Sequence, residues 1–341
     1  MSEEHINCTI DHQIHQYLFS GTYLLILLLG LPANIYSLYH ACVQLRARNE
    51  LGVYLLNLTV SDLLYLASLP LWLQYVIQGD DWRYREWLCK VCGMLLYENI
   101  YISIGFLCCI SIDRYLAVVY PFRFAAVRTV RAASLISAFV WSKELAVGTF
   151  IFSQKVLSLD ESNHSVCFEH YPMKPWEVPV NHYRFFVGFL FPLAILALSY
   201  FRVLHAVGKS AGTQAAQKTR IKHLVAGTVL IFLVCFSPYH VFLLARTLLE
   251  KDCHFATRIF NYYHFSLLLT SFNCVADPVL YCFISEGAQR AIRAARRACG
   301  HAPCCRRPAR EPGSDEVAAP GDSGTGAPAV TLLQQTKTCH A

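Results

Sequence analysis

The sequence carries little charge for its length. Charged residues make up only 15% of the 341 residues, whereas apolar residues make up 55%, and the mean hydropathy is +0.36. An average soluble domain has about 25% charged residues. This deficit argues against a soluble fold and directs attention to the apolar segments.

Several informative patterns are also missing. The chain shows no internal repeat, which weakens the case for a transporter built from repeated halves. It has no nucleophile-and-base arrangement with a recognisable motif, and its Cys and His spacings match no structural zinc template. We therefore expect neither an enzyme nor a metal site. Residues 1–16 lack the apolar core of a cleavable signal, so the first apolar segment is expected to direct its own insertion.

Long apolar stretches are abundant. A bilayer core of about 30 Å needs about 20 apolar residues per helix, and the stretches at 18–43, 51–77, 90–112, 132–153, 184–207, 224–247 and 257–284 meet this length. Backbone exposed to lipid must be satisfied within its own helix. The prolines inside the stretches should therefore kink the helices rather than end them: Pro32, Pro70, Pro192, Pro238 and Pro278. The predicted fold class is an all-α membrane protein, a bundle of seven transmembrane helices.

Basic residues follow the first, third, fifth and seventh predicted spans, within 46–48, 123–131, 209–222 and 290–297. Lys and Arg stay preferentially on the cytoplasmic side in short loops. The N-terminus has Glu3, Glu4 and Asp11 but no Lys or Arg, so we expect it to be extracellular. The net charge of +6 is then explained by topology, and no binding to nucleic acid is predicted.

The predicted domains are an extracellular N-terminus at 1–17, a seven-span domain at 18–284, a membrane-surface helix at 285–299 and a disordered cytoplasmic tail at 300–341. In 285–299, Ala and Ile alternate with Arg at helical spacing, which indicates an amphipathic helix in contact with membrane lipids. The tail is rich in Pro, Gly, Ala and Ser and lacks hydrophobic periodicity.

Four of the fifteen cysteines are predicted to face the oxidising side: Cys8, Cys89, Cys167 and Cys253. They allow three pairings, of which we favour Cys89 with Cys167 and Cys8 with Cys253. Asn7 and Asn163 begin glycosylation sequons in outer segments.

Marker residues stand at characteristic places along the spans. They are Asn34, Asp62, Cys89, Asp113-Arg114-Tyr115, Trp141, Pro192, Tyr200, Pro238 and Asp277-Pro278-Val279-Leu280-Tyr281. Through them the chain resembles the rhodopsin-like G-protein-coupled receptors over residues 17–299. The resemblance implies a plasma-membrane receptor whose partners are heterotrimeric G proteins, with arrestin and receptor kinases as further partners.

The resemblance also implies an activation switch. Arg114 is expected to pair with Asp113 at rest and to swing, together with two tyrosines, when span six moves outward to admit a G protein. The other switch residues are Tyr115, Tyr200, Phe236, Pro238, Pro278 and Tyr281. Phe236 replaces a tryptophan that many members carry, which puts the usual aromatic toggle in question. The alternative is an interfacial ion pair without a switching role.

Histidine is frequent, with 14 in the chain, and most lie in predicted outer segments. Histidine alone has an unperturbed pKa near physiological pH, so a group of them around one rim would gain charge together on acidification. New pairing with Glu169 or Asp11 could then favour a different arrangement of the outer helix ends.

Longer stretches narrow the resemblance to the proton-sensing group, and within it to the ovarian cancer G-protein-coupled receptor subfamily. These stretches are 8–12, 48–55, 97–103, 167–172 and 263–266. The sensing histidines implied by position are His12, His15, His170, His240 and His264. Gly79 stands where that subfamily has a histidine, so one titrating group is absent. By resemblance, the G proteins are expected to be of the q class.

A competing sensor consists of carboxyls inside the spans: Asp62, Glu144 and Asp277. Burial disfavours the charged form of such groups, so they could bind protons near neutrality. Asp277 stands where the family motif usually has asparagine, and together with Asp62 it could titrate as a coupled pair. The alternative role for Asp62 is to help hold a sodium ion. We keep the histidines and the acids as joint hypotheses.

Two other functions remain open. A proton-conducting membrane protein would also bury acids and histidines, although the marker residues argue against it. A receptor for a peptide or lipid could use Arg184, Arg246 and Glu98 as pocket charges.

Overall fold

The computed structural model describes residues 13–159, 164–168, 170–209 and 215–284, with backbone alone at 13–15, 215–217, 220 and 281–284. The predicted helix 285–299 and tail therefore lie outside the described residues, so the predicted domain limits stay predictions. The described elements all belong to one structural unit.

The first four predicted spans are unbroken helices: α1 (Gln13–Arg46), α2 (Glu50–Ile77), α3 (Glu86–Val119) and α4 (Val130–Phe152). Asn49 caps α2, its side chain accepting a hydrogen bond from the Leu51 N–H at 3.1 Å. Thr129 caps α4 in the same way through the Ala132 N–H at 3.2 Å. Such caps satisfy N–H groups that a helix start leaves without a partner.

The fifth and sixth spans each contain a π-helical turn. The fifth comprises α5 (Glu177–Phe185), η1 (Phe186–Leu190) and α6 (Phe191–Lys209), and the sixth comprises α7 (Ala215–Ile231), η2 (Phe232–Phe236) and α8 (Ser237–Leu249). Each turn ends just before a proline, Pro192 or Pro238. At the second, both the N–H and the hydroxyl of Ser237 donate to the Phe232 carbonyl. The prolines therefore change the helix type without ending the helix, as predicted.

The seventh span is divided into α9 (Cys253–Ser271) and α10 (Asn273–Ile284). Six helical segments of the described chain are long and apolar enough to cross a membrane, namely α1, α2, α3, α4, α5 with α6, and α7 with α8. The break at Phe272 and polar side chains such as Asp277 set the seventh apart. The predicted all-α bundle is confirmed, with one addition.

That addition is a hairpin of β1 (Leu157–Leu159) and β2 (Ser165–Cys167), paired antiparallel with Leu157 opposite Cys167. The predicted disulfide between Cys89 and Cys167 is confirmed and joins the hairpin to the start of α3. The next residue, Phe168, lays its ring against Gly93, where a Cβ would be only 2.1 Å away. We call the end of the bundle that carries this hairpin the hairpin end.

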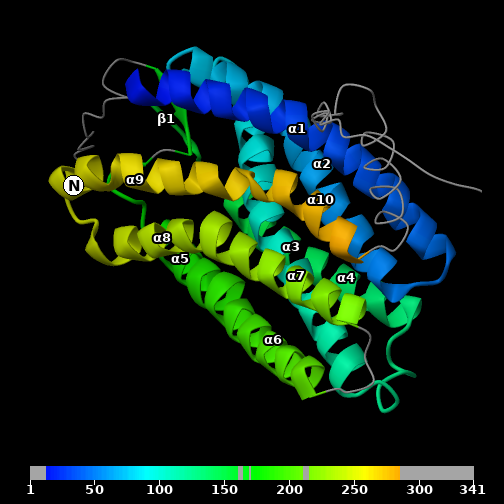
Figure 1. Cartoon of the computed structure of the whole chain (residues 1–341). Helices are drawn as coiled ribbons and strands as arrows, with labels where there is room; N and C mark the ends of the chain where they lie inside the picture. The colour runs from blue at the N-terminus through cyan, green and yellow to red at the C-terminus, as the bar shows by residue number, and fades with distance from the viewer. Residues whose placement is uncertain (1–12, 160–163, 169, 210–214, 285–341) are drawn as a thin grey trace, which may run out of the picture. The chain divides into compact units, whose positions relative to one another are not determined.

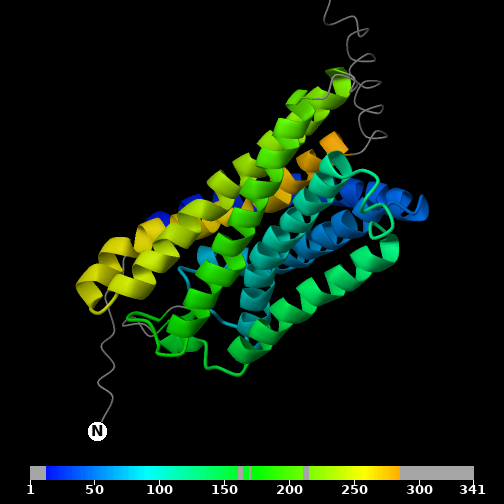
Figure 2. The ribbon, with the colours of Figure 1, turned by 90° about the horizontal axis from the view of Figure 1, so that it is seen from below.

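The helices lie side by side, with α3 in contact with α2, α4, α6 and α9 (Figure 1). The fifth and sixth spans run next to each other, with α5 against α8 and α6 against α7 (Figure 2). Large apolar side chains such as Leu28, Phe139, Leu198 and Phe201 are more than half exposed on the outside of the bundle. Surfaces of this kind suit lipid contact.

Candidate functional site

The segment that follows the hairpin is fastened to α8. Arg246 donates from Nη2 to the His170 carbonyl at 2.7 Å and from Nε to Glu250 Oε2 at 2.6 Å. Glu250 Oε1 in turn accepts from the Met173 N–H at 2.7 Å. Arg246 and Glu250 stand four residues apart on one helix face. This pair therefore clamps the backbone of the segment onto the sixth span.

His170 is buried within this segment, and its Nδ1 lies 2.5 Å from Oε1 of Glu177, at the start of α5. The contact is a hydrogen bond while the imidazole is neutral and becomes an ion pair when it is protonated. A buried charge needs a partner, and Glu177 supplies one. Nothing in the sequence spacing signalled this partner, because a loop separates the two residues.

His264 of α9 lies near the same segment. Its Nδ1 is 3.0 Å from the Phe260 carbonyl, and its ring centroid is 6.4 Å from that of Tyr171. The Arg246 guanidinium lies over the same tyrosine ring at 4.4 Å. The structure therefore brings the predicted histidine 264 and Arg246 close to the ring of Tyr171, the residue that directly follows His170.

His240 lies deeper, on α8, and is fully buried. Its ring stacks on Phe189 of η1 at 4.2 Å and 9°, and Nδ1 lies 2.8 Å from the Phe236 carbonyl. Its Nε2 has no hydrogen-bond partner in the described part of the chain. A charge at His240 would thus be surrounded mainly by aromatic rings, unlike one at His170.

Several predicted residues cannot be placed. His12, Glu169, Asn7, Asn163 and Cys8 lie outside the described residues, and the side chains of His15 and Tyr281 do so as well. Cys253 is disulfide-bonded, but its pairing with Cys8 stays a prediction.

Gly79 is part of the turn after α2. It adopts a φ of 73°, in the left-handed region that favours glycine. A Cβ at this position would meet open space. The absence of a histidine here therefore fits the backbone conformation and leaves no gap in the packing.

Two predicted acids meet in the core. Asp62 of α2 accepts a hydrogen bond from Asn99 Nδ2 at 2.8 Å through Oδ1, whereas its Oδ2 has no partner among the described residues. Both carboxyl oxygens of Asp277, on α10, also lack a partner there, and its charge interacts with that of Asp62. Asn273, one turn earlier on α10, is likewise unsatisfied. Such a set of buried oxygens suits a shared proton or a hard cation.

The third predicted acid lies elsewhere. Glu144 of α4 forms an ion pair with Lys143, and its charge interacts with that of Glu98 on α3. The three acids named from the sequence are therefore distributed over two places, with Asp62 and Asp277 in one and Glu144 in the other.

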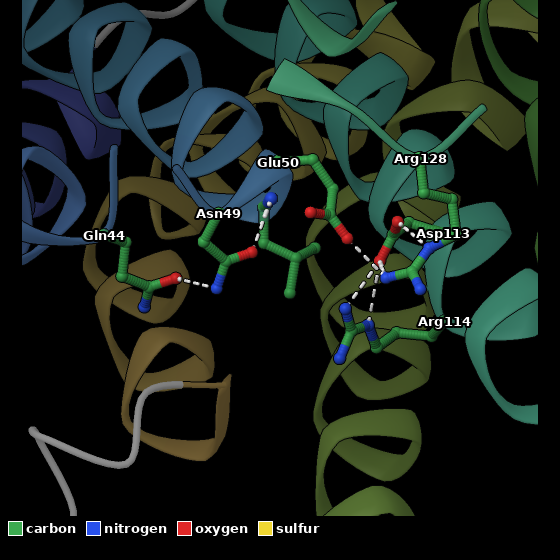
Figure 3. A network of polar contacts seen from close by, with 7 residues as sticks. Gln44, Asn49, Glu50, Asp113, Arg114 and Arg128 are labelled. Atoms are coloured by element: carbon green, nitrogen blue, oxygen red, sulfur yellow. Dashed lines mark hydrogen bonds and ion pairs between the residues drawn. The ribbon is translucent and has the colours of Figure 1, made fainter. Parts of the chain in front are cut away.

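At the end of the bundle opposite the hairpin, Asp113 is shared by two arginines (Figure 3). Arg114 Nη2 lies 2.6 Å from its Oδ2, and Arg128 Nε lies 2.9 Å from its Oδ1. Arg128 also donates from Nη2 to Oε1 of Glu50, at the start of α2, at 2.5 Å. The sequence pointed to the pair of Asp113 and Arg114, but it did not single out Arg128 or Glu50 as partners.

The other switch residues lie along α3, α6, η2, α8 and α10. The ring of Tyr115 is 5.7 Å from that of Tyr120. Tyr200 is buried, and its hydroxyl lies close to the side chain of Thr228. Phe236 is fully buried and packs edge-on against Phe232 at 5.6 Å. Pro238 stands in the first turn of α8, and Pro278 lies inside α10.

The comparisons agree with this architecture. The family described as 7 transmembrane receptor (rhodopsin family) matches residues 33–281. G-protein coupled receptor 68 of Mus musculus is 56% identical over 319 residues, and that of Homo sapiens is 54% identical; each alignment covers 94% of this chain and 87% of the relative. G-protein coupled receptor 65 of Homo sapiens is 37% identical over 287 residues, covering 81% of this chain and 85% of the relative. The chain therefore belongs to the rhodopsin family of seven-transmembrane G-protein-coupled receptors.

Proposed function

We propose that this receptor is activated by extracellular protons at the plasma membrane, through histidines at the hairpin end and carboxyl groups in the core. In this proposal the hairpin end faces the outside, and the receptor signals through heterotrimeric G proteins, mainly of the q class. Arrestin and receptor kinases are proposed as further partners. Support comes from the resemblance to the proton-sensing group and from the geometry around His170.

The contact between His170 and Glu177 is the observation that carries the proposal. While the imidazole is neutral, the contact is a single hydrogen bond. Protonation adds a positive charge opposite the carboxylate, in a buried place where attraction between charges is strong. Because Glu177 starts α5 and the His170 carbonyl is held by Arg246 of α8, the added attraction acts between the fifth and sixth spans.

Protonation of His264 adds a repulsion, in contrast to the attraction at His170. When protonated, it carries the same charge as Arg246, and both groups lie close to the Tyr171 ring. Like charges at this range repel. Acidification would therefore draw the segment at His170 toward α5 while pushing α9 away from Arg246. Two forces that act on neighbouring outer helix ends can shift a balance between two arrangements.

The core acids form a second layer of the proposal. Asp62 and Asp277 cannot both be ionised cheaply when their charges interact in a buried place, so one proton shared between them is favoured. The same oxygens, with Asn273, would suit a sodium ion, which would supply a positive charge in place of that proton. A proton that enters here relieves repulsion between α2 and α10.

At the inner end, Asp113 and Arg114 would hold the resting state, with Arg128 and Glu50 as additional clamps. Release of Arg114 together with an outward movement of span six would open the site for a G protein. The π turn before Pro238 gives that span a place to bend.

The experiment that tests the proposal measures inositol phosphate and cyclic AMP in cells as the medium is stepped from about pH 8 to about pH 6. We expect a graded response from the parent and a response displaced to lower pH when His170→Phe and His264→Phe are combined. His182→Phe is the matched control, because among the described residues the hydrogen bond of this α5 histidine is to the Val178 carbonyl of its own helix. An unchanged response in the double variant would overturn the assignment to these histidines.

A second candidate is a receptor for an added ligand, favoured by a pocket at the hairpin end. Aromatic rings dominate its lining, among them Tyr23, Trp72, Tyr97 and Tyr263. Arg246, one of the proposed pocket charges, is already paired with Glu250. Signalling in plain buffer on acidification supports the proton sensor, whereas a response that requires an added compound supports the ligand receptor.

A further inference from the structure

A second group of charged side chains lies between α3, α4 and α5, within the predicted membrane region. Glu98 of α3, Glu144 of α4 and Arg184 of α5 line one small pocket. Lys143 is paired with Glu144. The proposed function assigns the core proton to Asp62 and Asp277 and gives Glu98 no role.

Glu98 is more than nine-tenths buried, and its Oε2 has no hydrogen-bond partner in the described part of the chain. Its Oε1 lies against the backbone of α4 at Gly148, where an added Cβ would be 2.6 Å from the oxygen. The carboxyl reaches this place only because position 148 has no side chain. Glycine therefore lets Glu98 approach α4 one turn beyond Glu144.

Arg184 is a nearby cation that forms no ion pair with a carboxylate in the described part of the chain. Its guanidinium lies 3.8 Å from the centre of the Tyr97 ring, and its Nε has no hydrogen-bond partner among the described residues. It is close enough for its charge to interact with that of Glu98. The guanidinium nevertheless stacks on the Tyr97 ring and forms no hydrogen bond with Oε2 of Glu98.

This arrangement suits a neutral Glu98. An ionised carboxylate that is buried without a partner costs several kcal/mol, and the charge of Glu144 adds repulsion. A protonated carboxyl avoids both penalties. Once ionised, Glu98 would draw the guanidinium of Arg184 away from the Tyr97 ring.

We propose that Glu98 is a proton-binding site of this receptor and that its proton decides whether Arg184 stacks on Tyr97 or pairs with Glu98. The inference rests on the proposed function, because it adds a proton site to a receptor that protons activate. Among the described residues, the charged and titratable groups around Glu98 and Arg184 are Glu144, Lys143, Tyr183, Tyr97, Tyr101, Tyr239 and Tyr263.

A short chain of contacts connects Arg184 to the sixth span. Arg184 stands on α5 two residues before η1, and Phe189 within η1 stacks on His240 of α8. Gly188 of η1 also packs tightly against the Tyr101 ring, with an added Cβ only 2.7 Å away. Pairing between Glu98 and Arg184 would pull on this tightly packed turn, whereas protonation of Glu98 releases it.

The test combines pH-dependent signalling in cells with infrared difference spectra of the purified full-length receptor between alkaline and acidic pH. Glu98→Gln replaces the carboxyl with a permanently neutral group of the same shape. It should move the pH midpoint upward by about 0.5–1 pH unit and remove one protonated-carboxyl band from the difference spectrum. Glu86→Gln is the matched control, because this partly exposed glutamate at the start of α3 lies outside the site and pairs with Lys90 at 3.4 Å.

Gly148→Ala provides an independent variant. Its Cβ should push the Glu98 carboxyl away from α4 and from Glu144, which makes the proton easier to lose and moves the midpoint to lower pH. In an Arg184→Gln background, Glu98→Gln should produce no further shift, because the group that responds to the proton is gone.

The outcomes separate the two proposals. If the parent responds to pH and Glu98→Gln has the same midpoint and the same infrared band as the parent, Glu98 is not a proton site. The proposed function then still stands. A parent without any pH response overturns the proposed function, and the infrared band still decides whether Glu98 binds a proton. If Glu98→Gln fails to reach the cell surface, a Gly148→Ala midpoint equal to that of the parent overturns the site.

Discussion

Arg128 should act as a structural clamp between three segments. It bonds to Asp113 of α3 at 2.9 Å and to Glu50 of α2 at 2.5 Å, from the loop that precedes α4. Arg128 and Glu50 keep about a fifth of their side-chain surface exposed, so the values for fully buried pairs must be reduced. Hydrogen bonds between charged groups contribute about 1.5–3 kcal/mol each when buried. With this reduction, we expect Arg128→Gln to lower the free energy of unfolding by about 2–3 kcal/mol.

The assay is the thermal unfolding of the purified receptor in detergent. At about 2–4 °C per kcal/mol, Arg128→Gln should lower the Tm by about 4–12 °C. Glu50→Gln should cost less, because Arg128 retains Asp113. The double variant should be less destabilised than the sum of the two single variants by about 1 kcal/mol. Arg131→Gln, at an exposed arginine in the first turn of α4, is the control.

Two results would refute this reasoning. One is a Tm for Arg128→Gln that matches the Tm of the control. The other is strict additivity of the two substitutions, which would mean that Arg128 and Glu50 do not interact.

Three further predictions concern the outer turn and the core. The hydrogen bond from Arg83 holds the pKa of Asp81 below its ordinary value of about 3.9. The stabilisation that Asp81 provides is therefore present above that pH and is lost only as the pH falls through the lowered pKa. Asp81→Asn should reduce the Tm slightly and leave the signalling midpoint between about pH 8 and 6 unchanged. Gly79→His should steepen the pH response, because it adds a titrating group. It should also lower the Tm, because a histidine in the left-handed conformation of this turn costs about 1–2 kcal/mol in strain. Asp277→Asn should shift both the midpoint and the basal signalling, because it leaves Asp62 alone in the core; if both stay unchanged, the core pair has no part in sensing.

The spans and the first disulfide could be predicted from the sequence because each depends on a local pattern or on membrane topology. Apolar length defines the helices. The side of the membrane left four cysteines and three possible pairings, and the structure contains the favoured pair of Cys89 and Cys167. The hairpin escaped prediction because its strands have only three residues each, too few for a period to be detected.

The site contacts depend on distances in space. Glu50 and Arg128 are 78 residues apart, and no periodicity relates residues on different helices. The approach of Glu98 to α4 depends on Gly148, whose role is visible only when the two helices are packed. Grouping Glu144 with Asp62 and Asp277 was natural from their shared chemistry, but packing places Glu144 beside Lys143 and Glu98 instead.

The most direct test of the central proposal uses purified components. The receptor is reconstituted in lipid nanodiscs with a purified q-class G protein, and nucleotide exchange on the G protein is followed as the pH is lowered without any added ligand. The account predicts exchange that rises with acidity in the parent and is displaced to lower pH in the variant combining His170→Phe and His264→Phe. Exchange that is independent of pH in the parent, beyond the pH dependence of the G protein alone, would contradict it.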